Sequence, residues 1–199
     1  MPSLRNTAEE RSTADRLLDA ARDSILTVGW RRTTLTEVAR RAGVSRMTVY
    51  RTYPDMAALF GGLMTREWAA VAGTVLGNDD ASTTWPERLA AGLVGTVAAL
   101  RGDELFGRIV EVDPELLLPY LLERRGRSQE ALLGLLSARI AEGQDAGGLR
   151  AGDPAVQARA LVLAAHGYLL SAHTMADDRT PLAALDQELA ELVRRYLAP

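Results

Sequence analysis

The sequence predicts an all-α protein of about nine helices, in which a small helix-turn-helix unit precedes a larger helical body. Three observations support this fold class. Apolar residues recur at helical spacing along most of the 199 residues, and no stretch alternates between apolar and polar as a strand does. Ser, Thr and Asp stand where helices are expected to begin, and Gly or Pro stands at the breaks. Two short helical stretches near the N-terminus are separated only by a tight turn that contains glycine.

The first predicted helix covers residues 13–28 and supports the two that follow. Its apolar positions recur every three or four residues. Gly29 ends it, because glycine readily takes the backbone conformation that terminates a helix. The preceding residues 1–11 are polar and charged and are predicted to form a disordered or frayed tail.

The next two predicted helices are short and form the helix-turn-helix. The first begins at Thr34, which fits a capping box with Glu37 three residues later. Gly43 ends this helix at a position suited to left-handed backbone geometry. Ser45 then caps the other helix, which covers residues 46–52.

The rest of the chain is also predicted to be helical. Pro54 stops the third helix, because the residue before a proline is disfavoured in a helix. Asp55 caps a long fourth helix that reaches residue 76, and residues 77–83 form a polar loop. Pro119 is expected to kink or split the helix that contains it. The further predicted helices cover residues 84–100, 103–112, 114–122, 128–146, 153–175 and 181–197.

Charge is distributed unevenly along the chain. All 23 basic residues are arginine, and the formal net charge is −3. Residues 1–56 carry ten arginines and seven acidic residues, whereas residues 57–199 carry thirteen arginines and nineteen acidic residues. Within residues 31–51, six arginines accompany one acidic residue. This pattern indicates a DNA-binding domain at residues 12–56, which the fourth helix (55–76) links to a sensing body within residues 57–199.

A set of motifs at defined spacing occupies residues 34–59. Thr-x-x-Glu-Val-Ala opens the second helix, Ala-Gly-Val-Ser forms the turn and Thr-Val-Tyr follows, before Tyr53, Pro54-Asp55 and Leu59. Through this set the chain resembles the TetR family of bacterial transcriptional regulators. One position departs from the pattern, because Met56 stands where the family commonly has a lysine near the DNA backbone.

The resemblance implies a sequence-specific transcriptional regulator, in the first instance a repressor that a small-molecule effector releases from a palindromic operator in double-stranded DNA. It also implies a homodimer through the last two helices. A recognition helix places some side chains on base edges while others hold phosphates. Arg46 suits a guanine edge, and Tyr50 matches the family's phosphate-binding tyrosine. The residues expected at the DNA are Thr34, Arg46, Met47, Thr48, Tyr50 and Arg51.

Aromatic residues of the body are candidates to line a ligand cavity, although an aromatic at helical spacing is more often part of a plain core. Tyr120 stands out, because the neighbouring Pro119 breaks a helix and leaves unpaired backbone groups near a possible cavity. The candidate lining residues are Trp68, Phe106, Tyr120, His166 and Tyr168.

Two alternatives stay open. His166 and His173, the only histidines, share a helix face and would serve a metal-dependent protein or an enzyme. Their spacing is about 10.5 Å along a helix, too long for one ion. A ligand-independent adaptor that binds protein through the body is the second alternative. The sequence has no cysteine and no Walker, G-x-G-x-x-G or H-E-x-x-H motif, so we expect no metal, cofactor or catalytic residue.

The N-terminus is polar and lacks an apolar signal region, and no apolar run is long enough for a membrane span. We therefore expect a cytoplasmic protein that does not enter the membrane.

Overall fold

The computed structural model describes residues 12–76 and 83–199, so the predicted tail at residues 1–11 and residues 77–82 of the predicted polar loop lie outside it. All regular elements in these ranges are helical, which confirms the all-α prediction. The described ranges contain ten α-helices and two short 3-10 helices: α1 (Thr13–Val28), η1 (Trp30–Arg32), α2 (Leu35–Arg41), α3 (Arg46–Thr52), α4 (Met56–Leu76), α5 (Trp85–Arg101), α6 (Glu104–Val112), η2 (Pro114–Leu116), α7 (Leu118–Leu122), α8 (Arg127–Asp145), α9 (Pro154–Met175) and α10 (Leu182–Leu197).

Most observed helix bounds agree with the predicted ones within one residue at each end. The exception is the stretch predicted as one helix over residues 114–122, which forms the two short elements η2 and α7. The two elements meet at Leu117, two residues before Pro119. Pro119 lies in the first turn of α7, where its missing N–H has no helical partner to lose. The expected split is therefore confirmed.

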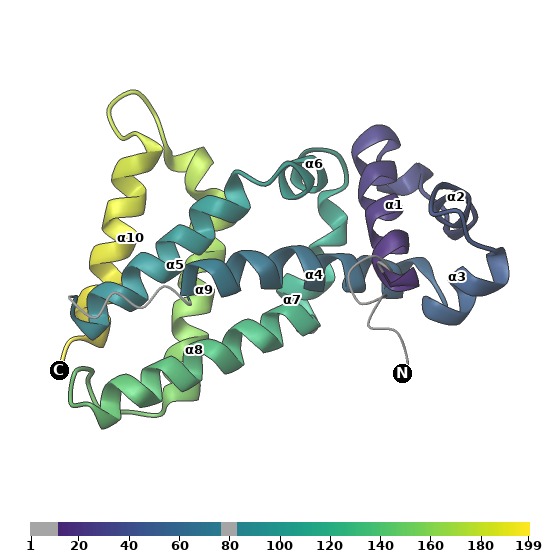
Figure 1. Cartoon of the computed structure of the whole chain (residues 1–199). Helices are drawn as coiled ribbons and strands as arrows, with labels where there is room; N and C mark the ends of the chain where they lie inside the picture. Colours follow the sequence, from purple (N-terminus) through teal and green to yellow (C-terminus); the bar gives the residue numbers. More distant parts are fainter. Residues whose placement is uncertain (1–11, 77–82) are drawn as a thin grey trace, which may run out of the picture.

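A small head formed by α1–α3 lies at one end of the molecule, and α4 runs from this three-helix head into the body (Figure 1). At the opposite end α9 and α10 lie side by side, with α5 against α10 and α8 against α9. In contrast, α6 packs beside α1. The body therefore contacts the three-helix head mainly through α4 and α6, and also through η2.

Two hydrophobic clusters form the core, and the first includes both the head and α6. Leu17, Val38 and Val49 of the head share this cluster with Leu59 of α4 and Ile109 of α6. The second cluster is formed mainly by α5, α8, α9 and α10. Because packed interiors transmit displacement rather than absorb it, a movement of α6 is expected to act directly on the head. None of the described helices combines the length and hydropathy needed to cross a membrane.

The start of α4 packs closely against the end of α3 at Gly62. A Cβ atom on Gly62 would lie 2.9 Å from Cε1 of Tyr53, whereas a Cβ atom on the adjacent Gly61 would meet nothing within 4 Å. Asp55 caps α4 as predicted, since its Oδ1 accepts a hydrogen bond from Ala58 N at 2.7 Å. The glycine at position 62 is thus required for packing between α3 and α4.

Candidate DNA-binding surface and ligand cavity

Thr34 begins α2, and its hydroxyl oxygen accepts a hydrogen bond from Glu37 N at 3.2 Å. The Glu37 carboxylate accepts from Nε and Nη2 of Arg40, at 2.8 and 2.7 Å, and from Nε of Arg41, at 2.8 Å. The prediction that Glu37 would complete a capping box is therefore wrong. Hydrogen bonds from Arg40 and then Arg41 lower the pKa of Glu37 to about 2. Much of the charge on α2 is consequently neutralised within the helix.

The turn between α2 and α3 has the predicted geometry. Gly43 has a φ of 65°, in the left-handed region that favours glycine. Ser45 Oγ accepts a hydrogen bond from Thr48 N at 3.1 Å and lies 2.8 Å from Thr48 Oγ1. Val49 is fully buried in the first cluster. The cap and this buried side chain together fix which face of α3 points outward.

The outward face of α3 carries four of the side chains predicted at the DNA, spaced i, i+1, i+4 and i+5. Met47 is 79% exposed and Tyr50 is 50% exposed. Arg46 and Arg51 are exposed too, and neither forms a hydrogen bond or ion pair with another described residue. Of the other two predicted residues, Thr34 is exposed at the start of α2, while Thr48 is half-buried with its hydroxyl against Ser45.

Met56, the departure from the family pattern, is half-buried and packs against the first cluster. Its thioether stabilises the start of α4 by burial, whereas a lysine ammonium at this position would be drawn toward solvent. The site therefore presents its positive charge from α3.

A polar clamp joins the three-helix head to the body at η2. Trp30 N donates a hydrogen bond to Asp113 Oδ2 at 2.9 Å. Arg31 donates to Glu115 Oε1 from Nε at 2.9 Å and from Nη2 at 2.6 Å. Asp113 is only 2% exposed, and its Oδ1 lies 3.5 Å from Arg31 Nε. We call these four residues the head–η2 clamp.

The head–η2 clamp could not be predicted from the sequence, because its partners are 83 and 84 residues apart. Arg31 is one of the six arginines of the basic stretch 31–51, but its guanidinium is engaged by Glu115, which raises the pKa of Arg31. Only the tertiary contact between η1 and η2 reveals this role.

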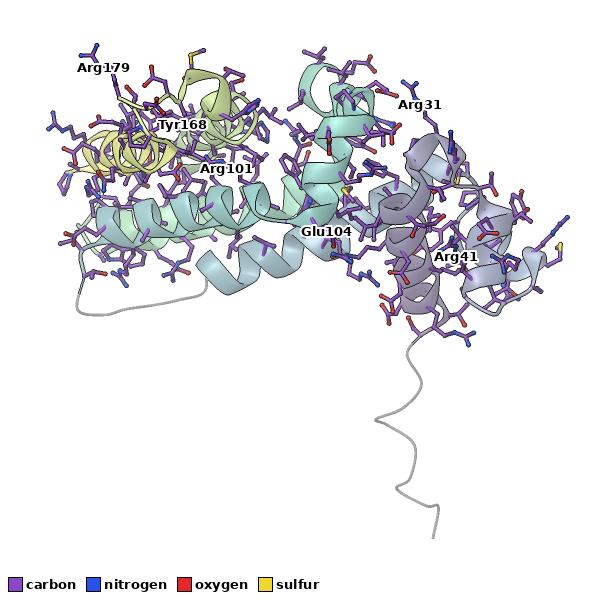
Figure 2. The ribbon with its side chains drawn as sticks, turned by 90° about the horizontal axis from the view of Figure 1, so that it is seen from above. Arg31, Arg41, Arg101, Glu104, Tyr168 and Arg179 are labelled. Carbon is purple, nitrogen blue, oxygen red and sulfur yellow. The ribbon has the colours of Figure 1, made fainter. Side chains whose placement is uncertain are left out.

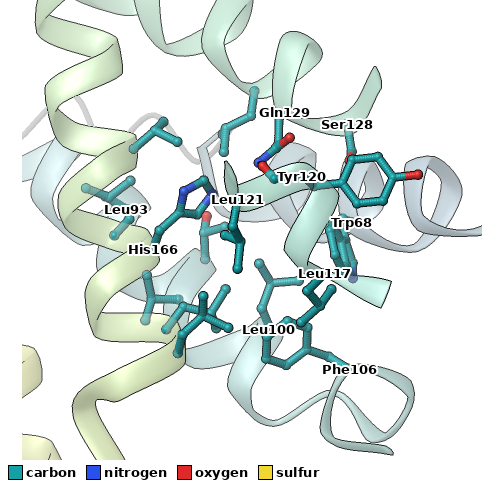
Figure 3. A pocket seen from close by; sticks show the side chains of 17 residues that line it. Trp68, Leu93, Leu100, Phe106, Leu117, Tyr120, Leu121, Ser128, Gln129 and His166 are labelled. Carbon is teal, nitrogen blue, oxygen red and sulfur yellow. The ribbon is translucent and has the colours of Figure 1, made fainter. Parts of the chain in front are cut away.

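A cavity opens where α4, α5, α6, α7, α8 and α9 meet, and its lining is almost wholly apolar (Figure 3). The structure brings together four of the five residues predicted to line a ligand cavity, namely Trp68, Phe106, Tyr120 and His166. His166 reaches in from α9, on the opposite side from Trp68 and Tyr120 (Figure 3). Further lining residues that sequence reasoning missed are Leu93, Thr96, Val97, Leu100, Leu117, Leu121, Ser128, Gln129, Leu132, Val162, Ala165, Leu169 and Leu170.

Tyr168 lies outside this cavity. It is two residues beyond His166 on α9, a step that turns its side chain to a different face of the helix. There it packs with the second cluster, and its carbonyl oxygen accepts a hydrogen bond from Arg101 Nη2 at 3.2 Å. Figure 2 shows Tyr168 close to Arg101, well away from the head.

The polar groups of the cavity are few, and two of them are engaged within the protein. Gln129 Nε2 donates to Tyr120 O at 3.1 Å, and Thr96 Oγ1 donates to Gly92 O at 2.8 Å. Burial lowers the pKa of His166, so its imidazole is neutral near pH 7. Trp68 Nε1 is buried without a hydrogen-bond partner among the described residues. The cavity therefore suits an apolar guest rather than a charged one.

The second histidine differs from the first in its surroundings. His173 is exposed near the end of α9, whereas His166 is half-buried in the cavity. Asp177 Oδ1 is occupied by hydrogen bonds from Arg179 N and Thr180 N, at 2.9 and 2.7 Å. Within residues 12–76 and 83–199, no group of three His, Asp or Glu side chains is placed to hold a metal ion.

Comparison with known proteins identifies the helix-turn-helix. The family model described as "Bacterial regulatory proteins, tetR family" matches residues 17–63. An uncharacterised HTH-type transcriptional regulator of Mycobacterium bovis is 37% identical over 190 residues, which are 95% of this chain and 96% of the relative. The chain belongs to the TetR family. It is a helix-turn-helix transcriptional regulator, and α2 and α3 are its helix-turn-helix.

Solved structures of TetR-family proteins share the whole fold. The repressor QsdR of R. erythropolis has a TM-score of 0.70 and 17% identity, with 93% of this chain and 94% of that chain covered. The repressor AlkX from Dietzia has a TM-score of 0.65 and 20% identity, with 93% and 97% covered. The TetR-type arrangement thus extends through the body, where the family model does not reach.

Proposed function

We propose that this TetR-family regulator is a homodimeric repressor that binds a palindromic operator and is released by a small-molecule effector. In this proposal residues 12–56 read the DNA, and residues 57–199 bind the effector and dimerise. The observation that carries it is the outward face of α3, where two arginines without an acidic partner among the described residues stand on a helix-turn-helix. Such a face has the charge and donors that a major groove requires.

The roles proposed for individual side chains follow from their exposure and chemistry. Arg46, at the start of α3, is placed to donate two hydrogen bonds to a guanine edge. Met47 offers an apolar contact to a thymine methyl group. Tyr50 and Thr34 are assigned to phosphates through their hydroxyl groups, and Arg51 to the backbone or an outer base. Thr48 is the sixth proposed contact, at the edge of this surface.

Dimerisation is assigned to α9 and α10 because α9 has an apolar face that nothing in the described chain covers. Leu163 is 71% exposed, and Val156 and Leu192 are also largely exposed. Small residues on the same face of α9 would let a second helix approach closely; they are Ala160, Ala164, Gly167 and Ser171. A twofold dimer would present two α3 helices to half-sites about 34–36 Å apart.

Effector release is proposed to act through α4 and α6. Trp68 of α4 and Phe106 of α6 line the cavity, and α6 ends at Asp113 of the head–η2 clamp. An effector that binds better when these helices are displaced would favour a dimer whose heads no longer match the operator spacing. The fourth helices would then act as levers, and the clamp would carry the movement of α6 to the head.

The test is quantitative DNA binding by the full-length protein to operator sites mapped on genomic DNA. Specific binding to a palindrome, with an affinity that falls steeply with salt, is expected. Arg46→Ala should lose about 1–3 kcal/mol of discrimination between operator and mutated sites. Tyr50→Phe should weaken binding to all sequences about equally. Lack of duplex binding even at low salt would refute the proposal, and reversed effects would exchange the two roles.

A matched control is Arg179→Ala. This arginine is exposed, and it lies at the end of the molecule opposite the head (Figure 2). The variant removes the same charge as Arg46→Ala, so unchanged operator affinity would show that position, rather than total charge, decides binding.

A further inference from the structure

We propose that the effector is an amphiphile with one slim apolar chain and an anionic head group. Its apolar chain would lie in the cavity, and its head group would contact Arg124 and Arg159. The inference rests on the proposed effector response and deepens it by naming the chemical class. Three features of the structure support it: the inner cavity excludes charge, an outer hollow lies beside it, and that hollow offers arginines with no acidic partner.

The inner cavity accepts only the uncharged part of a ligand. It is small, with a volume of about 90 Å³, and no arginine or acidic side chain lines it. His166 is neutral there because burial lowers its pKa. An ionised group inside would lose its hydration without gaining a counter-charge. The small volume of this apolar space also favours a slim chain over a bulky ring system.

The outer hollow is larger, with a volume of about 530 Å³, and adjoins the inner cavity. It lies between α7, α8 and α9. Five residues line both spaces, namely Tyr120, Leu121, Gln129, Val162 and His166. The two spaces are therefore adjacent, and rotation of the shared side chains would let a single molecule place its apolar chain in the cavity and its anionic head group in the hollow.

Five charged side chains line this hollow, and they leave an excess of positive charge. Arg125 Nε donates to Glu130 Oε1, so these two charges neutralise each other. The remaining three are Arg124, Arg159 and Glu123.

Neither of the two remaining arginines forms an ion pair with an acidic residue of the described chain. The Arg124 guanidinium lies 5.6 Å from the ring centre of Tyr120, and Arg159 Nη1 donates only to Ala155 O of its own helix, at 3.2 Å. Guanidinium groups without an acidic partner bind carboxylates and phosphates through paired, charge-assisted hydrogen bonds. Tyr120 connects the two parts of the site, since its ring lies under Arg124 and also lines the cavity.

The experiment measures binding by calorimetry, and release from operator DNA, for three series of equal chain length. The probes are saturated unbranched carboxylates, the corresponding coenzyme A thioesters and the corresponding primary alcohols. Affinity should rise about fourfold per added methylene until the cavity is filled. The anionic probes should bind at least about tenfold more tightly than the alcohols. The tighter of the two anionic series identifies the head group.

Arginine variants test whether the anionic head group of the effector binds in this hollow. Arg124→Gln and Arg159→Gln should each weaken anionic probes about tenfold and leave alcohols unchanged. Arg127→Gln is the matched control, because Arg127 begins α8 only three residues after Arg124 but does not line the hollow. All three arginines are exposed, so the variants should fold. Light scattering checks that each remains a dimer, since Arg159 borders the exposed face of α9.

Alcohols that bind as tightly as the carboxylates would overturn the inference. It would also be overturned if Arg127→Gln lowered the affinity for anionic probes as much as Arg124→Gln and Arg159→Gln do. Failure of all three series to bind a protein that still binds its operator would overturn the inference alone. Failure to bind any palindromic DNA would instead refute the proposed function.

Discussion

The sharpest prediction concerns Asp113 of the head–η2 clamp. Asp113→Ala removes the carboxylate that accepts the hydrogen bond from Trp30 N and that faces Arg31. We expect the free energy of unfolding to fall by about 2 kcal/mol. The same variant should also weaken the effect of effector on operator binding, because α6 would be held to the head by apolar packing and exposed ion pairs alone.

The magnitude follows from three contributions. A hydrogen bond to a charged acceptor contributes about 1.5–3 kcal/mol. The ion pair with Arg31 adds little, because the Arg31 side chain is 72% exposed and solvent screens its charge. In the opposite direction, removal of a carboxylate that is 98% buried relieves its desolvation, and its Oδ1 accepts no hydrogen bond from a described residue. The hydrogen bond and the ion pair together stabilise the protein by more than the desolvation of the carboxylate costs, so removing Asp113 gives a net loss of stability.

The assay is urea-induced unfolding followed by tryptophan fluorescence, with hydrogen exchange at the Trp30 amide as a local readout. Asp113→Asn should lose only about half as much stability, since the amide oxygen can still accept from Trp30 N. Glu115→Gln is the control, because it affects the exposed part of the clamp and should lower the free energy of unfolding much less than Asp113→Ala does. The reasoning would be refuted if Asp113→Ala lowered the free energy of unfolding no more than Glu115→Gln and left hydrogen exchange at the Trp30 amide unchanged.

Two further predictions concern the head. Gly62→Ala should destabilise the protein by about 1–3 kcal/mol in thermal or urea unfolding, because its Cβ atom must displace the ring of Tyr53. Gly61→Ala, where a Cβ atom meets nothing, should instead stabilise by up to about 1 kcal/mol. The lowered pKa of Glu37 predicts a stabilisation that is complete above its usual pKa of 4.5 and is lost as pH falls toward about 2. The difference in unfolding free energy between wild type and Glu37→Gln should vanish across that range; a difference that stays constant with pH would contradict it.

The helices could be predicted because their signals are local. Caps such as Ser45 and Asp55, and the turn glycine at position 43, act on backbone groups within a few residues. The outward face of α3 could be inferred in the same way, since helical periodicity fixes it once Val49 is known to be buried. Glu37 shows the limit of such reasoning, because two nearby arginines compete successfully for its carboxylate.

The cavity could be predicted only in part. Large aromatic residues in a helical body suggest a lining, and Trp68, Phe106 and Tyr120 do line it. Tyr168 has the same chemistry but the wrong helical phase, and no local pattern indicates which side of α9 faces the cavity. Gln129 gave no signal, because its hydrogen bond to Tyr120 O depends on how α7 turns back toward α8.

By itself the sequence determined the helical class, nearly all helix bounds, the helix-turn-helix and the family resemblance, because each depends on interactions between near neighbours along the chain. Tertiary structure decided three other features: the packing of α6 into the core of the head, the head–η2 clamp, and the position of the apolar cavity beside an arginine-lined hollow. These join residues tens of positions apart, and their contacts exist only once helix packing has fixed the position and rotation of each helix.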